Sequence, residues 1–401
     1  MSTVEVLHAG TSERARQVVR FYRPELDGLR FFAFLAVYVC HSIPSDAVLV
    51  AQQSKVSPIS FLAAIKDAGN FGVCLFFMLS AFLITELLRR EEEAYGHIHV
   101  GAFYARRSFR IWPLYFGITI AYVVGGCHFH AMEIERGRVL AYFFLAGNWY
   151  IALHPWIQTP LRSLWSISVE EQFYLIWPLL ACYCGVRSLF KASLLIIPIS
   201  LLTIFVVSAD KAYAYNTTWL NSFAQFQFFA WGALLALTLR GKVSEVCHLT
   251  RCVSGGAGIA IWLLAAYATK IKRPGVQAPS MQFCLGYLLV AFGCLLLLLA
   301  VLGVRRRLVP EWMVYLGKIS FGLYVFHETA FLLVDELQKH SVRSLPPVAA
   351  WSAQNAAVAL ILNKVLAFGV TVLLAMLSYR FWESPFLRLK RRFTWVPSRD
   401  I

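Results

Sequence analysis

Residues 30–41 read Arg-Phe-Phe-Ala-Phe-Leu-Ala-Val-Tyr-Val-Cys-His, an apolar run that begins with a cation and ends with an imidazole. Eleven residue steps of α-helix rise about 16 Å, roughly half the hydrocarbon thickness of a bilayer. If Arg30 lies at one interface, His41 lies near the middle of the membrane or just beyond it. A titratable group at that depth is costly and indicates a functional site, although His41 could also simply end a short helix.

The whole chain has the composition of a membrane protein. Of its 401 residues 59% are hydrophobic and 15% are charged, which excludes an ordinary soluble fold. The first 25 residues are charged and contain no apolar stretch, so we predict a cytosolic tail and not a cleaved signal peptide. The net charge of +15 comes from loops between apolar segments, which favours the positive-inside rule over a nucleic-acid partner.

Ten apolar segments have the length of a transmembrane helix. They fall at about 31–50, 68–88, 111–130, 168–186, 190–208, 219–239, 252–270, 281–303, 318–335 and 356–379. The stretch 139–152 is too short to span comfortably and contains Gly147 and Asn148, so we expect it to lie in the interface or to re-enter. The sequence therefore predicts an all-α polytopic membrane protein with about ten transmembrane helices.

The distribution of basic residues supports this topology. With a cytosolic N-terminus, 25 of the 37 Lys and Arg residues fall in cytoplasmic segments and 11 in outer ones, while Lys364 lies within a span. Counting 139–152 as a span would move the arginines at 305–307 to the outer side. We therefore predict two cytoplasmic termini, with a cytosolic tail at 1–25, a transmembrane domain at 26–387 and a basic cytosolic tail at 388–401.

Two arginines open the third predicted span. Arg107 and Arg110 are three residues apart and therefore share one face of a helix. Two guanidinium groups on one face can hold a phosphate through paired hydrogen bonds. Ordinary anchoring of a span at the cytoplasmic interface is the simpler explanation of these two residues on their own.

A second motif leads into the fourth span. Ser166 and Glu170 are four residues apart, so both can face one cavity, and Glu170 could orient a histidine or accept a proton. Helix capping explains the adjacent Glu171 well and Glu170 less well.

The span at 318–335 carries a polar stripe. Ser320, Tyr324 and His327 fall at helical spacings of four and three. Such a stripe is typical either of a helix that faces a cavity or of a hydrogen bond between two membrane helices. The nine cysteines show no metal-ligand spacing with histidines, so we expect no metal site.

Taken in order, these motifs resemble the integral-membrane acyltransferase family 3, which O-acylates sugars and other hydroxyl compounds. The matching runs are LDGLR at 26–30 followed by His41, FGVCLFFMLSAFLI at 71–84, RSFRIWPLY at 107–115, WSISVEEQFYL at 165–175, GKISFGLYVFH at 317–327 and YRFWESPF at 379–386. Phe321 stands where many members have tyrosine. Because no hydrolase-like domain follows the last span, we expect a stand-alone form without that extracytoplasmic domain.

The resemblance implies a multi-pass O-acyltransferase of the plasma (bacterial inner) membrane. It implies transfer of an acyl group, with acetyl favoured, from cytosolic acyl-CoA to a hydroxyl of a sugar or cell-envelope glycan at the outer side. Acyl-CoA is then a co-substrate, no cofactor is permanently bound, and the oligomeric state stays open. A transporter of acyl groups or sugar solutes without catalysis is the alternative.

The same reasoning assigns roles to individual residues. We expect His41 to act as general base, with Glu170 orienting it and Arg30 assisting. Arg107 and Arg110, again with Arg30, are expected to bind the acyl-CoA phosphates. Four further residues are expected to contact the acceptor or to line the cavity: Asp27, Ser166, Tyr324 and His327.

Overall fold

The computed structural model describes residues 21–43, 57–129, 135–154, 159–209, 214–243, 246–269, 271 and 279–396. Within these ranges the chain is helical and contains no β-strand, so the predicted all-α class is confirmed. The longer helices are α2 (Pro24–Ser42), α4 (Ser57–Gly69), α5 (Phe71–Tyr95), α6 (Val100–Phe129), α9 (Trp165–Cys184), α10 (Val186–Val207), α12 (Ser222–Leu239), α13 (His248–Leu264), α14 (Ser280–Val301), α16 (Ser320–Ser344) and α18 (Ala356–Leu377).

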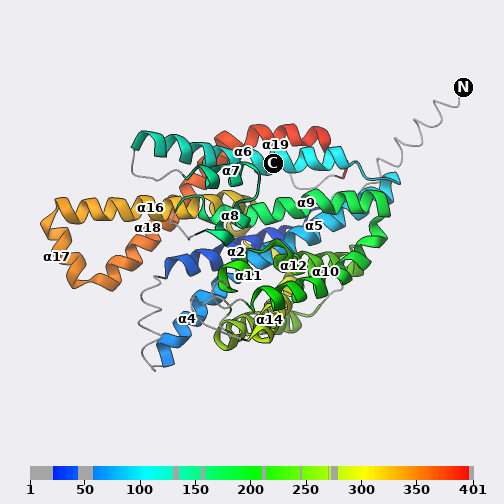
Figure 1. Cartoon of the computed structure of the whole chain (residues 1–401), viewed down its shortest axis with the longest axis horizontal. Coiled ribbons are helices and arrows are strands. Elements are labelled where there is room, and N and C mark those ends of the chain that lie inside the picture. Colours follow the sequence, from blue (N-terminus) through cyan, green and yellow to red (C-terminus); the bar gives the residue numbers. More distant parts are fainter. Residues whose placement is uncertain are drawn as a thin grey trace, which may run out of the picture.

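These helices form one bundle with α2 and α5 in its middle (Figure 1). Helix α5 packs against α12, which in turn packs against α10, while α13 pairs with α14 and α16 with α18. Helix α6 and the short α19 (Ser384–Lys390) lie together along the top of Figure 1, on the opposite side from α14. Helix α2 therefore contacts both halves of the bundle, through α5 on one side and through α15 (Glu311–Lys318) and α16 on the other.

Six helical stretches in the described part of the chain are long and apolar enough to cross a bilayer, which makes this an integral membrane protein. They are Phe61–Tyr95, Val186–Val207, Ser222–Leu239, His248–Thr269, Ser280–Val301 and Ala356–Phe393. The other four predicted spans coincide with α2, α6, α9 and α16, although residues 44–50 of the first lie outside the described ranges. These four helices carry all the candidate site residues named above.

The stretch at 139–152 does not form one helix. It divides into α7 (Arg136–Phe143) and α8 (Gly147–Leu153), and the turn between them puts Leu145 at a φ of 56°. The side chain of Gln172 in α9 fastens this turn by donating to the carbonyl oxygen of Leu145 and to Asn148 Oδ1, both at 3.0 Å. Neither helix is long enough to span a bilayer.

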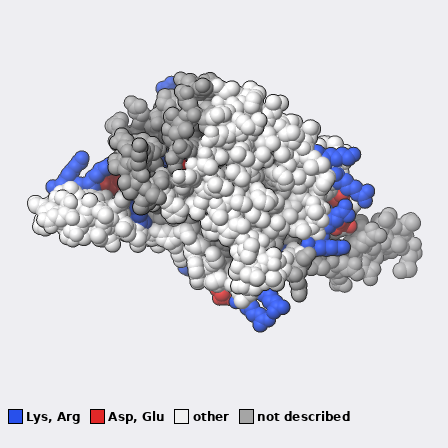
Figure 2. Space-filling view, turned by 90° about the horizontal axis from the view of Figure 1, so that it is seen from below, with Lys and Arg blue, Asp and Glu red and all other residues white. Residues whose placement is uncertain are grey.

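Charged residues are sparse over much of the molecular surface. Figure 2 shows a broad face that is almost free of Lys, Arg, Asp and Glu, with the cations gathered near its edges. This pattern suits an apolar belt in contact with lipid. The segment after α19 also returns to the bundle, because Arg106 Nη1 donates to the carbonyl oxygen of Phe393 at 2.7 Å. The start of the predicted basic tail at 388–401 is thus packed against the membrane domain.

Two glycines let α2 approach its neighbours closely. A Cβ on Gly72 of α5 would lie 2.3 Å from the carbonyl oxygen of Ala33, and a Cβ on Gly317 of α15 would lie 1.8 Å from that of Asp27. Small residues permit such close backbone contact between membrane helices. These two contacts hold the N-terminal half of α2, which carries Asp27 and Arg30, in a fixed position.

We expect Gly317→Ala to lower the melting temperature of the purified protein, because α15 must move away from α2 to make room for the methyl group. Overpacking of this kind costs about 1–3 kcal/mol. Gly369→Ala is the matched control, since that helical glycine has no atom within 4 Å of the added Cβ. Equal melting temperatures for the two variants would show that the α2–α15 contact does not limit stability.

Candidate functional site

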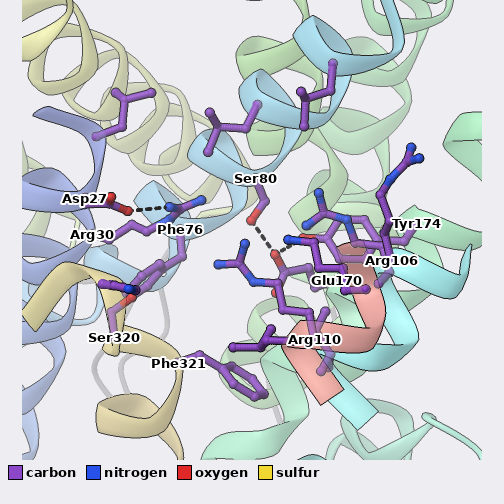
Figure 3. Close-up of a pocket in the computed structure, with 18 of the residues that line it drawn as sticks. Asp27, Arg30, Phe76, Ser80, Arg106, Arg110, Glu170, Tyr174, Ser320 and Phe321 are labelled. Carbon is purple, nitrogen blue, oxygen red and sulfur yellow. Dashed lines mark hydrogen bonds and ion pairs between the residues drawn. The ribbon is translucent and has the colours of Figure 1, made fainter. Parts of the chain in front are cut away.

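A cavity lined by seven cationic side chains lies between α2, α5, α6, α9, α16 and α19. The cations are Arg23, Arg30, Arg106, Arg107, Arg110, Lys318 and Lys390. Figure 3 shows Asp27 and Arg30 on one side of this cavity, Arg106 and Arg110 on the other, and Ser80 with Glu170 between them. Four carboxylates also line the cavity, namely Asp27, Glu91, Glu170 and Glu383. The cations thus outnumber the anions, and the cavity favours an anionic ligand.

The predicted face shared by Arg107 and Arg110 is confirmed, since both line the cavity from α6. The Arg107 guanidinium lies 5.3 Å from the centre of the Tyr174 ring, and its Nε is buried without a hydrogen-bond partner among the described residues. The neighbouring Arg106 is instead paired with Glu91, with Nη2 at 3.0 Å from Oε2. Arg107 therefore offers a buried donor that a bound anion can satisfy.

Arg30 is held at the cavity by Asp27, one turn earlier on α2. Arg30 Nη1 donates to Asp27 Oδ1 at 2.9 Å, and the Asp27 side chain is 2% exposed. Glu25 and Asp27 occupy the first turn of α2, where the helix dipole favours acidic residues. Asp27 lines the cavity as predicted, and its visible role is to position the Arg30 guanidinium.

Glu170 faces the same cavity from α9. Its Oε1 accepts hydrogen bonds from the hydroxyl groups of Ser80 and Tyr174. Ser166, one turn earlier, also lines the cavity, as their spacing predicted. Glu170 is thus part of the arginine-lined cavity.

His41 belongs to a second cluster with His327 and Glu328 of α16. Its Nδ1 lies 2.9 Å from His327 Nε2 and 3.0 Å from Glu328 Oε1. Glu328 also accepts a hydrogen bond from Arg162 Nε at 3.1 Å. His327 is fully buried and Glu328 nearly so, whereas the His41 side chain is 24% exposed.

The hydrogen-bond contacts of the cluster indicate which ring nitrogens of His41 and His327 carry a proton. His327 Nδ1 lies 2.6 Å from the carbonyl oxygen of Tyr324, which can only accept, so His327 Nδ1 carries a proton and neutral His327 Nε2 accepts. His41 Nδ1–H then donates to His327 Nε2 and Glu328 Oε1. This tautomer leaves the lone pair of His41 on Nε2, where it can act as a base. The arrangement is that of a histidine oriented by a carboxylate.

The carboxylate beside His41 is therefore Glu328 and not Glu170, which corrects the pairing expected from the sequence. Glu170 is occupied by Ser80 and Tyr174, and among the described residues it forms no contact with His41. His41 and its partners also do not line the arginine-lined cavity. The reason is topological, because His41 lies at the opposite end of α2 from Arg30.

Tyr324 stands between the two groups. It lines the arginine-lined cavity together with Ser166, whose Oγ lies 2.7 Å from the Tyr324 hydroxyl. One turn later on α16 is His327, whose ring centre lies 5.5 Å from that of Tyr324. The predicted stripe is thus divided, with Ser320 and Tyr324 facing the cavity and His327 facing His41. The inner end of the cavity and the histidine cluster meet at this tyrosine.

The His41 cluster also has the donor set of a three-ligand metal site. One atom from each of His41, His327 and Glu328 lies within 4.8 Å of the others. The direct hydrogen bond between the two imidazoles and the bond from Arg162 to Glu328 already occupy these atoms. A cation bound by both imidazole nitrogens would have to displace the hydrogen bond between them, so hydrogen bonding accounts for the cluster as it stands.

Several site residues were not identified from the sequence. Glu328 carried a usable signal, because it follows His327 directly in a predicted span and a carboxylate there is costly unless paired. Arg162 lies just before α9, and no local pattern relates it to α16. Ser80 is a single hydroxyl in an apolar run, a common neutral feature of membrane helices.

Comparison with known proteins links most of the chain to one family. A family model described as an acyltransferase domain matches residues 23–380. This range includes the part of the arginine-lined cavity on α2, α5, α6 and α9 and the histidine cluster on α2 and α16, whereas the cavity wall on α19 lies beyond it. No solved structure matches the chain.

Two of three curated relatives match over most of the chain, and all three are themselves much longer. O-acetyltransferase OatA of Staphylococcus aureus is 23% identical over 94% of this chain and 59% of its own length. YrhL of Bacillus subtilis is 28% identical over 91% of this chain and 55% of its own length. Peptidoglycan O-acetyltransferase OatA of Listeria monocytogenes is 32% identical over 41% of this chain and 25% of its own length. The chain therefore spans little more than half of these proteins at most.

Proposed function

Because the chain belongs to the acyltransferase family whose model covers residues 23–380, we propose that it is a membrane O-acyltransferase. It moves an acyl group, with acetyl favoured, from cytosolic acyl-CoA to a hydroxyl of a cell-envelope glycan on the outer side. The relatives in S. aureus and L. monocytogenes are named as O-acetyltransferases, the latter of peptidoglycan, which supports this acyl group and this class of acceptor. The membrane is then the bacterial inner membrane.

The observation that carries the proposal is the meeting of two chemically different sites at Tyr324. On one side is a cavity with an excess of arginines and lysines, suited to the phosphates of acyl-CoA. On the other side is a histidine whose Nδ1–H is held by a carboxylate, suited to take a proton from a hydroxyl. In an acyl transfer whose donor and acceptor approach from opposite sides, the donor-binding cavity must meet the general base, as these two sites do at Tyr324.

In the proposed reaction, Arg107, Arg110 and Arg30 bind the phosphates, and the thioester reaches the end of the cavity at Ser166 and Tyr324. The acceptor hydroxyl attacks the thioester carbonyl carbon as His41 Nε2 takes its proton. The new C–O bond forms, the C–S bond breaks, and the imidazolium returns the proton to the leaving thiolate. Glu328 stabilises the imidazolium during this step, and Arg162 holds Glu328 in place.

The proposal includes the ten-span topology with both termini in the cytoplasm. It puts the cavity mouth with Arg106, Lys318 and Lys390 on the cytoplasmic side, where the positive-inside rule favours cations. It puts His41, Arg162 and α17 (Pro346–Gln354) toward the outer side.

We expect Gln354→Cys to react with a membrane-impermeant maleimide in intact cells and Arg307→Cys to react only after lysis. Both side chains are exposed, and the background is a variant in which all nine cysteines are replaced. Labelling of Arg307→Cys in intact cells would overturn the orientation.

The function is tested with purified protein, acetyl-CoA and soluble peptidoglycan fragments. We expect release of free CoA that depends on the acceptor, together with a matching mass increase of the glycan from one acetyl ester. If acetyl-CoA were consumed at the background rate and a solute instead accumulated inside sealed vesicles, the protein would be a transporter. Other acyl-CoA thioesters in the same assay define the acyl group.

A further inference from the structure

A second pocket lies on the surface beside the arginine-lined cavity. Its lining consists of four cations and three hydroxyl-bearing side chains, with no carboxylate: Lys318, Arg380, Arg388, Arg391, Tyr315, Tyr379 and Ser384. Only Lys318 and Tyr379 are common to both cavities. The composition differs from the main cavity, where four carboxylates lie among the cations.

The turn between α18 and α19 places the side chains of Arg380 and Ser384 at this surface pocket. Residues Ser378–Glu383 form a π-helical turn that joins α18 to α19. Within it Glu383 accepts a hydrogen bond from Ser378 at 3.0 Å and lines the main cavity, whereas Arg380 lines the surface pocket. Ser384 Oγ donates to the carbonyl oxygen of Tyr379 at 2.6 Å, which joins the turn to α19. Glu383, the one carboxylate of the turn, therefore lines the main cavity and not the surface pocket.

The arginines of this pocket are not neutralised within the described part of the chain. Arg380, Arg388 and Arg391 are exposed, and none forms an ion pair with a described carboxylate. Like charges gathered in one pocket repel one another, and a bound anion relieves that repulsion. Guanidinium, ammonium and hydroxyl groups together offer the donors that phosphate oxygens accept.

The surroundings of the pocket are those of a membrane interface. Trp312 on α15 and Phe381 and Trp382 on the π-helical turn are 59%, 66% and 49% exposed. Exposed aromatic residues of this kind gather at the level of lipid headgroups. The outward side of α18 just before the turn is apolar, with Leu373 and Leu377 exposed. A lipid lying along α18 therefore brings its headgroup to the arginines.

We propose that this pocket binds the phosphate of an anionic membrane lipid. Basic pockets between membrane helices are suited to such headgroups. The opposite side of α19 carries Leu387 and Lys390 into the main cavity, so a bound lipid also fixes one wall of that cavity. The lipid binding itself does not depend on the proposed acyl transfer.

The test uses the purified full-length chain and short-chain phosphatidylglycerol as probe, with phosphatidylcholine as the neutral lipid. We expect phosphatidylglycerol to raise the melting temperature saturably and phosphatidylcholine to have no such effect. Arg388→Gln with Arg391→Gln should weaken the apparent affinity at least about tenfold, since both charge-assisted hydrogen bonds to the phosphate are lost. Arg305→Gln with Arg307→Gln is the matched control, because it removes two exposed arginines that line neither cavity.

Equal weakening in both double variants would overturn the proposal in favour of nonspecific attraction to anionic lipid. If the Arg388 and Arg391 variant bound phosphatidylglycerol normally but bound CoA weakly, the pocket would belong to the donor site. Stabilisation by inorganic phosphate equal to that by the lipid would make free phosphate the ligand. Arg388→Lys with Arg391→Lys keeps the charge, and its partial recovery of lipid affinity separates loss of binding from loss of folding.

Discussion

His41→Ala is expected to reduce acyl transfer by about 10²–10⁴-fold while binding of acyl-CoA stays unchanged. The imidazole is the group placed to remove the acceptor proton, because its Nδ1–H is held by His327 and Glu328 and its Nε2 is left for substrate. The donor cavity is lined by other residues, so the variant should still bind acyl-CoA. The measurements are initial rates with purified protein and equilibrium binding of acyl-CoA.

His154→Ala is the matched control, since His154 is exposed and lies outside the cluster. Glu328→Gln provides a second, independent variant, because an amide can no longer stabilise the imidazolium that forms during transfer. Its effect should fall on kcat, with little change in the affinity for acyl-CoA. Transfer by His41→Ala at the wild-type rate would remove the assignment of the base, and a loss seen equally in His154→Ala would point to unfolding.

The sequence alone predicted the elements of this fold well. Long apolar segments identify membrane helices because only a helix satisfies every backbone group within lipid. Spacing along one helix was equally informative, since Arg107 and Arg110, like Ser166 and Glu170, do share a face of their helix. The division of 139–152 into two helices agrees with its length and with Gly147.

Contacts between helices could not be predicted in this way. His41 and His327 are 286 residues apart, and they meet only because α2 packs against α16 in the folded bundle. Local periodicity describes which residues share a face but not which helix that face meets. The expected partner of His41 was therefore Glu170, the more conspicuous carboxylate, when Glu328 is the one that packs against it.

Arg107→Ala combined with Arg110→Ala is expected to weaken acyl-CoA binding by at least about 10²-fold and to change the rate at saturating donor much less. Each arginine can form charge-assisted hydrogen bonds with a phosphate, and each such bond contributes about 1.5–3 kcal/mol. Arg107 Nε is buried and without a partner among the described residues, so in the free protein no competing bond must be broken. The measurements are the Kd for acyl-CoA and KM compared with kcat.

The lysine variants at both positions separate charge from geometry. A lysine keeps the positive charge but not the planar fork, so Arg107→Lys with Arg110→Lys should recover only part of the lost affinity. Arg305→Ala with Arg307→Ala removes the same charge away from the cavity and should leave the Kd unchanged. If the alanine variant at 107 and 110 bound acyl-CoA normally but lost kcat, these arginines would act in the reaction and not in donor binding. Arg107 and Arg110 line a cavity that neither His41 nor its partners His327 and Glu328 line, which argues for binding, because a group that acts on the transferred acyl carbon must lie near the base.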